Sequence, residues 1–212
     1  MARLPAAAGR ARSLFHTLVY EGSLAGDAGF TLFNGELGAA CLALATEDRA
    51  GRAWCKANGY GGYTSYASLD DLPRRMSVFD DLRRRLDRHV AAFADDLAFD
   101  LGGRRLKLDS LWVNVLKPGS AHSGHLHPHS VVSGTVYVAT PEGAGGLRLE
   151  DPRLARMMAA PTRRTDAPEP LKPFITLKPE PGAVFLWESW LRHEVPAGAG
   201  KAPRISISFN YA

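Results

Sequence analysis

The chain has 212 residues, of which 45% are hydrophobic and 23% are charged, and its formal net charge is +4. This length and composition are ordinary for a soluble globular protein. No apolar run approaches the length of a membrane span, so we expect no membrane partner. The excess positive charge comes from scattered arginines without an aromatic-interleaved basic stripe, which argues against a nucleic-acid partner.

We interpret residues 1–13 as a flexible N-terminal arm and residues 14–212 as a single domain. The arm is rich in Ala and Arg, and no apolar segment follows it as in a signal peptide. Cys41 and Cys55 are the only cysteines, too few for a disulfide framework. We therefore expect a reducing, cytoplasmic location.

The first part of the domain, about 14–100, is predicted to be helical. One apolar stripe at helical spacing follows Asn34, a candidate N-cap. A longer stripe runs from Phe79 to Leu97 with charges between its members. Between them lies the loop from Gly59 to Tyr66, whose glycines argue against regular structure. Its tyrosines either line a pocket or pack within the loop.

The second part, about 104–212, is predicted to be a sheet structure. Alternating patterns and turn residues place strands near 105–116, 131–139, 146–150, 174–177, 182–187 and 204–211. Three of them carry one apolar and one polar or mixed face. The polar faces either surround a cavity inside a sandwich or lie in water. The basic segment 153–173 is either a lid or a mobile loop.

Four of the seven histidines fall between His122 and His129. His125 and His127 are two residues apart, so a strand would direct both side chains to one metal ion, and His193 is the candidate third ligand. Such open sites suit non-haem iron enzymes, in which a carboxylate usually occupies the place that His127 takes here.

Beside His125 and His193, the remaining ligand is therefore either His127 or a neighbour such as His129, Glu150 or Asp151. His129 and Asp151 are also candidates for the second coordination shell. A zinc site and a His-rich surface loop with no specific ligand remain alternatives.

Arg204 lies eleven residues after His193, and Ser206 shares its face of the predicted last strand. A guanidinium and a hydroxyl together are suited to hold the far carboxylate of 2-oxoglutarate by charge-assisted hydrogen bonds. A structural zinc site would have no need of this pair. An ordinary salt bridge is the alternative role for Arg204.

At this point the chain resembles the iron(II)/2-oxoglutarate-dependent oxygenase superfamily, and more narrowly a group of uncharacterised bacterial and phage members. The resemblance rests on short motifs whose joint order spans about half the chain. They are Trp112-x-Asn114, His125-Leu-His127-Pro128, Ser133-Gly134, Tyr137, Asp151-Pro152-Arg153, His193-Glu-Val195 and Arg204-Ile-Ser206 with the residues up to Asn210. The Gly59–Tyr66 loop is similar to that group as well.

The resemblance implies a mainly β fold, a double-stranded β-helix (jelly-roll) core packed against N-terminal helices. It implies an Fe(II) cofactor on His125, His127 and His193, with 2-oxoglutarate as co-substrate on Arg204 and Ser206. Asn114 and Tyr137 are further co-substrate candidates because of the direction they face. The reaction would be hydroxylation by O2 with decarboxylation of 2-oxoglutarate to succinate.

The prime substrate is a small molecule, an amino acid or a peptide. Its pocket is expected at Trp112, Tyr63, Tyr66 and Trp190, and a homodimer is plausible. Two other functions fit the histidines: a cupin-like three-His dioxygenase that uses no 2-oxoglutarate, and a non-catalytic metal-binding jelly-roll.

Overall fold

A computed structural model of the chain describes residues 9–212. Four helices precede most of the strands: α1 (Phe30–Glu47), α2 (Arg49–Ala57), α3 (Leu72–Arg75) and α4 (Ser77–Asp96). The strands are β1 (Val19–Ser23), β2 (Gly62–Thr64), β3 (Leu108–Leu116), β4 (His122–His125), β5 (Val132–Ala139), β6 (Leu147–Glu150), β7 (Phe174–Leu177), β8 (Ala183–Glu188), β9 (His193–Val195) and β10 (Arg204–Tyr211).

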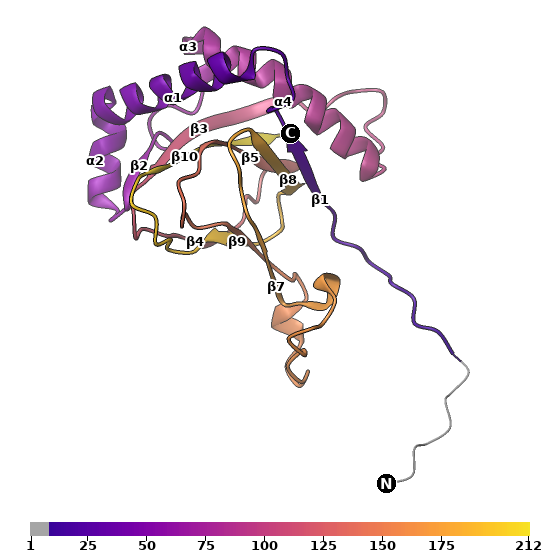
Figure 1. The fold of residues 1–212 in the computed structure, drawn as a ribbon. Coiled ribbons are helices and arrows are strands. Elements are labelled where there is room, and N and C mark those ends of the chain that lie inside the picture. The colour runs from indigo at the N-terminus through magenta and orange to yellow at the C-terminus, as the bar shows by residue number, and fades with distance from the viewer. Residues whose placement is uncertain (1–8) are drawn as a thin grey trace.

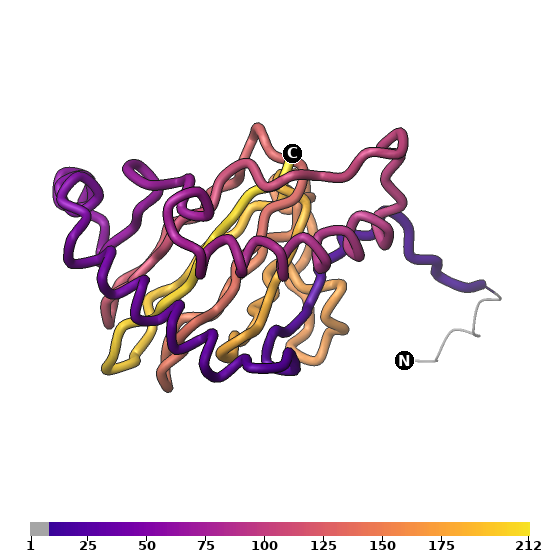
Figure 2. Tube along the Cα trace, turned by 90° about the horizontal axis from the view of Figure 1, so that it is seen from above, coloured from indigo at the N-terminus to yellow at the C-terminus, as the bar shows by residue number. Residues whose placement is uncertain are grey.

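The strands form two antiparallel sheets that face each other. The major sheet has six strands in the order β1-β8-β5-β10-β3-β2, and the minor sheet has four in the order β4-β9-β6-β7. The helices cover the outer face of the major sheet, and the minor sheet lies on its other side (Figure 1). Figure 2, which is seen from above, shows α1 and α4 lying across this sheet. The expected jelly-roll with a helical layer is confirmed.

The alternation of β3 and β10 decides which face of the major sheet is apolar. Val113, Val115, Ile205 and Ile207 are buried in the main core together with α4 residues such as Leu82. Each fully buried aliphatic side chain of this kind contributes about 1.5–3 kcal/mol. The opposite face of the same strands carries polar side chains, which are enclosed between the two sheets. Of the two arrangements left open by the pattern, the structure has the sandwich with an internal cavity.

All six predicted strands are present as β3, β5, β6, β7, β8 and β10. Four short strands were not predicted. Two of them, β1 and β2, come from the part of the chain expected to be helical, and they form the two edges of the major sheet. The expectation that glycines exclude regular structure from the 59–66 loop is therefore wrong at β2. A Cβ atom at Gly62 would lie 2.1 Å from the carbonyl oxygen of Val115, so glycine is what permits the strands to approach.

The predicted N-cap Asn34 is also wrong. Helix α1 begins one turn earlier, after Gly29, which has a left-handed conformation (φ 73°). Asn34 lies inside the helix, and its Nδ2 donates a hydrogen bond to the carbonyl of Val138 at 3.1 Å. The side chain that suggested a helix end instead ties α1 to β5 in the sheet below it.

The remaining segments are irregular or short. Residues 9–13 have no regular structure, and the first eight residues of the expected arm lie outside the described part. The 153–173 segment contains two 3-10 turns, Leu154–Arg156 and Glu169–Leu171. Cys41 and Cys55 are buried free thiols. Within residues 9–212 no helix has both the length and the apolar character that crossing a membrane requires.

Replacing Gly62 by alanine should destabilise the fold by about 1–3 kcal/mol, because the new methyl group would overlap the Val115 carbonyl and separate β2 from β3. Gly35→Ala is the matched control. A Cβ atom there meets nothing within 4 Å, and its helical position should gain up to about 1 kcal/mol. Urea unfolding of both variants measures the difference, and equal stability of the two would contradict the close approach at β2.

Candidate metal and co-substrate site

Three histidines converge inside the sandwich at one end of the minor sheet. His125 ends β4 and His193 begins β9, and the two are direct partners in the antiparallel pairing of these strands. His127 follows β4, and its backbone N–H donates to the carbonyl of Ser189 at 3.0 Å. One potential ligand atom from each of the three rings lies within 4.8 Å of the other two. This grouping is the one metal-binding cluster in the described residues, and it contains no carboxylate.

The protein fixes which ring nitrogen of His125 and His193 is free. The Nδ1 atom of His125 lies 2.8 Å from the carbonyl oxygen of Ser123, and that of His193 lies 2.9 Å from the carbonyl oxygen of Leu191. A carbonyl oxygen can only accept, so both Nδ1 atoms carry the proton. Each ring therefore presents a deprotonated Nε2, the form that ligates a metal.

His127 is oriented by polar side chains rather than by a backbone carbonyl. Its Nδ1 lies 2.7 Å from Oδ1 of Asn210 and 2.8 Å from Oγ of Ser133. The Ser133 hydroxyl also donates to Asn210 Oδ1 at 2.8 Å, so the amide oxygen accepts from both neighbours. All three candidate ligands thus have Nδ1–H bound to the protein and Nε2 free.

Burial keeps these rings neutral. Desolvation, together with the neighbouring His125, lowers the pKa of His193 to about 3. Desolvation also lowers the pKa of His125 and of His127, and the pKa of the nearby His122 falls to about 4. Protons therefore do not compete with a metal ion for these nitrogens near neutral pH.

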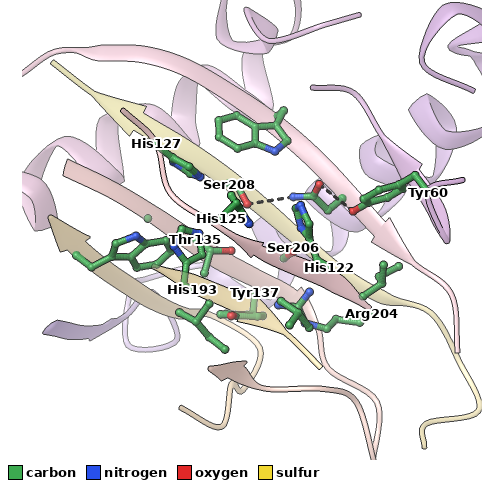
Figure 3. A pocket seen from close by; sticks show the side chains of 17 residues that line it. Tyr60, His122, His125, His127, Thr135, Tyr137, His193, Arg204, Ser206 and Ser208 are labelled. Atoms are coloured by element: carbon green, nitrogen blue, oxygen red, sulfur yellow. Dashed lines mark hydrogen bonds between the residues drawn. The ribbon is translucent and has the colours of Figure 1, made fainter. Parts of the chain in front are cut away.

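The histidines open into a narrow cavity between the two sheets, with Arg204 at its other end (Figure 3). Arg204 is 6% exposed, and its guanidinium lies 4.8 Å from the centre of the Tyr137 ring. No salt bridge joins Arg204 to a carboxylate within residues 9–212, and none of the residues that line the cavity is acidic. The ordinary salt bridge considered for Arg204 is absent from this part of the chain.

Three buried polar atoms on the cavity lining have no hydrogen-bond partner among the described residues. They are Nε of Arg204, the hydroxyl of Tyr137 and Nε1 of Trp187. An unsatisfied buried polar group costs about 1–3 kcal/mol, and more when it is charged. An anionic ligand in the cavity would accept hydrogen bonds from these donors and neutralise the buried guanidinium of Arg204.

A second group of polar side chains connects the cavity to the 59–66 loop. The Tyr60 hydroxyl donates to Oδ1 of Asn114 at 3.3 Å, and Nδ2 of Asn114 donates to Oγ of Ser208 at 3.0 Å (Figure 3). Ser206 is 2% exposed, and it lies between Asn114 and Tyr137 in the register of the sheet. The sequence-predicted co-substrate residues Arg204, Ser206, Asn114 and Tyr137 are thus brought together.

Several other candidate residues lie elsewhere. His129 is exposed, and Asp151 is paired with Arg153 at 2.9 Å, whereas Glu150 is paired with Arg192 at 3.2 Å. None of the three belongs to the histidine cluster in the described residues. Both carboxylate oxygens of Asp151 instead accept hydrogen bonds from Arg153.

The expected substrate residues divide in the same way. Trp112 lines the cavity, and the exposed ring of Tyr66 packs edge-on against it at 5.2 Å. Trp190 is 45% exposed and is not among the lining residues. Tyr63 does not line the cavity either, because it is buried under the helices, with its hydroxyl donating to Asp48 at 2.9 Å.

Tyr60 and Trp187 also line the cavity, as do His122, Thr135 and Ser208, which the sequence did not single out as site residues. His122 stacks on His125 with 4.5 Å between ring centres, and Trp187 lies 4.5 Å from His193. The cluster of histidines from 122 to 129 was a signal for His122. The alternation of β5 and β10 was a signal for Thr135 and Ser208, which share faces with Tyr137 and Ser206.

A wider hollow of about 780 Å³ lies beside the metal end of the sandwich. It is lined by residues 11–17 and 149–153 and by Pro168, Pro170, Leu171 and Lys172. Leu149 and Leu191 form part of its floor, and Leu149 is the β6 partner of His193. The 153–173 segment therefore borders an opening near the histidines.

Comparison with known proteins agrees with this geometry. Residues 110–210 match the family model described as "Putative 2OG-Fe(II) oxygenase", where 2OG is 2-oxoglutarate. These residues run from β3 through β10 and include the three histidines and Arg204. This part of the chain, just under half of its length, is thus similar in sequence to the 2OG-Fe(II) oxygenases. No curated protein sequence matches the chain.

Solved structures of such oxygenases share the fold at low identity. A prolyl-4-hydroxylase from Pseudomonas putida is 17% identical, with 92% of each chain covered and a TM-score of 0.57. The epimerase SnoN of nogalamycin biosynthesis, in complex with Fe3+ and alpha ketoglutarate, is 18% identical, with 92% of this chain and 78% of SnoN covered and a TM-score of 0.60. HygX from Streptomyces hygroscopicus, with nickel and 2-oxoglutarate bound, is 15% identical, with 92% and 82% covered and a TM-score of 0.59.

The metal-free protein should lose stability as the pH falls from 7 to 5. Burial lowers the pKa of His193 and its neighbours, so in this range the unfolded chain binds protons that the folded chain does not. Each such group contributes a loss of about 1.4 kcal/mol per pH unit below its ordinary pKa of about 6.5. The free energy of unfolding in urea at several pH values measures the slope.

His193→Gln should reduce this slope, whereas His16→Gln, at an exposed position, should leave it unchanged. An unchanged slope in His193→Gln would contradict the burial of a neutral imidazole at this position.

Proposed function

We propose that the protein is a non-haem, Fe(II)- and 2-oxoglutarate-dependent oxygenase that hydroxylates a C–H bond of its prime substrate. The observation that carries the proposal is the joint geometry of the cavity. Three imidazoles with their Nδ1–H groups held by the protein converge at one end, and a buried Arg204 with an unpartnered Nε lies on the same lining.

The donor set fits a divalent transition metal. His125, His127 and His193 would hold the ion through Nε2, and three protein ligands leave coordination positions open for a chelating co-substrate and O2. When bound, Fe(II) supplies the redox chemistry that couples decarboxylation of 2-oxoglutarate to succinate with transfer of one oxygen atom of O2 to the substrate. The solved SnoN and HygX structures contain Fe3+ and nickel, respectively, each with this co-substrate.

The chain's own residues would fix the co-substrate at its far end. Arg204 and Ser206 lie on one face of β10, and a guanidinium paired with a hydroxyl suits a carboxylate. The Tyr137 hydroxyl, which lacks a partner in residues 9–212, is a third donor, and Asn114 holds the neighbouring Ser208 in place. Because no acidic side chain lines the cavity, an anion meets no repelling negative charge there.

The walls of the cavity would exclude water from the reacting groups. Trp187 packs against His193, and Trp112 against His127 with 5.8 Å between ring centres. We place the prime substrate on the side where Tyr66 meets Trp112 at the surface. The prime substrate there is a small molecule, an amino acid or a peptide. Two buried free thiols support a reducing cytoplasm as its location.

The two rival functions give no role to some features of the cavity. A three-His dioxygenase without 2-oxoglutarate would need the histidines but not a buried, unpaired Arg204 next to Ser206. A non-catalytic metal site would have no open coordination position. Both rivals leave the unpartnered donors of the cavity without a role.

Anaerobic addition of 2-oxoglutarate to the Fe(II)-loaded protein should produce a visible metal-to-ligand charge-transfer band. Arg204→Ala should weaken 2-oxoglutarate binding at least about 10- to 100-fold, because charge-assisted hydrogen bonds of about 1.5–3 kcal/mol are lost. Fe(II) affinity, measured by calorimetry, should stay unchanged because Arg204 is not a ligand.

Arg84→Ala, on the exposed side of α4, is the control and should change neither affinity. Metal binding without any 2-oxoglutarate band in the wild type would favour the rival functions. Succinate release across a panel of substrates then tests turnover.

A further inference from the structure

The last strand, β10, supports His127, the candidate ligand that departs most from the expected metal site. Residue 127 is a histidine where such sites usually carry a carboxylate, and a histidine there must keep its ring in one orientation with Nε2 free. The two other histidines achieve this through backbone carbonyls of their own neighbourhood, two residues earlier in the chain. His127 instead relies on Asn210, 83 residues later, at 2.7 Å.

The surroundings of Asn210 fix which end of its amide faces His127. Nδ2 of Asn210 donates to Oγ of Ser110 at 3.2 Å, which leaves Oδ1 toward the imidazole. The Ser133 hydroxyl donates to the same Oδ1, and Ser189 lies 2.7 Å from Ser133 Oγ. Asn210 is 8% exposed, and Ser133 and Ser189 are fully buried, so water does not compete for these contacts.

The sheet register supplies this arrangement directly. Asn210 of β10 pairs with Ser110 of β3 on one side and with Ser133 of β5 on the other. Cross-strand neighbours on one face have Cβ atoms about 4.5–5.5 Å apart, which is within hydrogen-bonding reach for these short side chains. Three neighbouring strands thus each contribute one polar group to the support of a single imidazole.

The chemical character of Asn210 matters as much as its position. Metal-ligating histidines donate their second N–H to a carboxylate, a carbonyl or water, and loss of that acceptor costs metal affinity. An aspartate would have nearly the same shape as Asn210 but would bring a negative charge next to the site. The amide accepts the same hydrogen bond and leaves the positive charge of the metal undiminished.

We propose that Asn210 is the positioning residue that makes His127 a metal ligand, by accepting its Nδ1–H. The inference rests on the proposed function, because it assumes that the three histidines bind a metal ion. It adds a residue of the last strand that touches neither the metal nor the co-substrate.

The test compares Fe(II) affinity in three variants by anaerobic calorimetry. Asn210→Ala should weaken binding about 10- to 100-fold, because the Nδ1–H of His127 loses the amide oxygen and keeps only the Ser133 hydroxyl, at 2.8 Å, as a neighbour. Asn210→Asp keeps an acceptor and should bind Fe(II) at least as tightly as the wild type. Asn34→Ala is the matched control, since its amide also joins two elements by one hydrogen bond but on the helical side of the sheet, and its affinity should be unchanged.

The 2-oxoglutarate charge-transfer band gives a second readout. In Asn210→Asp a more electron-rich His127 should shift this band to lower energy. An Asn210→Ala affinity within about twofold of the wild type, or an Asn210→Asp affinity that falls as far as that of Asn210→Ala, would overturn the proposal.

Imidazole ¹⁵N NMR of the wild type keeps the proposal testable even if Asn210→Ala does not fold. The zinc-loaded protein should show His127 with its proton on Nδ1, and a proton on Nε2 would refute the assigned role. A wild type that binds neither Fe(II) nor zinc would overturn the proposed function itself. A wild type that binds metal with Nδ1–H at His127 but shows no change in the Asn210 variants would overturn only the role of Asn210.

Discussion

The position of β10 in the centre of the major sheet is the constraint on which the site depends. This strand is hydrogen-bonded to β3 on one side and to β5 on the other, so its register is fixed twice. Ile205, Ile207 and Phe209 are held in the core under the helices. A slip of one residue would turn these apolar side chains toward the cavity and the polar ones toward the helices, so the apolar face prevents it.

The polar face of β10 therefore spans the site from end to end. Arg204 and Ser206 lie where the co-substrate is proposed to bind, and Asn210 lies where His127 is held. Six residues of extended strand cover about 20 Å, which is enough to separate the carboxylate anchor from the metal ligands within one rigid element. The minor sheet brings His125 and His193 opposite this face through the pairing of β4 with β9. One face of β10 thus packs against the helices, and its other face lines the cavity.

The parts that sequence could predict are those with strong alternation or distinctive chemistry. Strand β10 and its two neighbours have apolar residues at every second position, and the imidazoles and Arg204 have few other roles in such a pattern. The short strands β2 and β9 have three residues each, too few for a period to be read. Strand β2 is an edge strand, and it also depends on pairing with β3, which is distant in sequence. Asn34 misled the prediction because the partner of its amide, Val138, is more than a hundred residues away.

Contacts between distant segments also decide which candidate residues reach the site. A side chain such as Tyr63 has the right chemistry for a pocket, yet only its contact with Asp48 reveals that it faces the helices. Trp187 lines the cavity on a strand that reads as uniformly apolar. Its position in the site follows from its contact with His193, which the local sequence pattern does not reveal. Asp151 and Arg153 belong to one family motif, and their side chains pair with each other rather than with the histidines.

The absence of a carboxylate from the described part of the site has an electrostatic consequence. With a carboxylate ligand, Fe(II), a buried arginine and a 2-oxoglutarate dianion would together be neutral. With three neutral imidazoles the same assembly keeps one positive charge in a low-dielectric cavity, where charge interactions are strong. Binding of the dianion is then favoured more than in a neutral site. The metal ion, however, must be bound by well-oriented imidazoles without the attraction of a carboxylate. Orientation of His127 by the neutral amide of Asn210 is consistent with that balance, since a buried carboxylate at the same place would have weakened the attraction that the rest of the cavity provides.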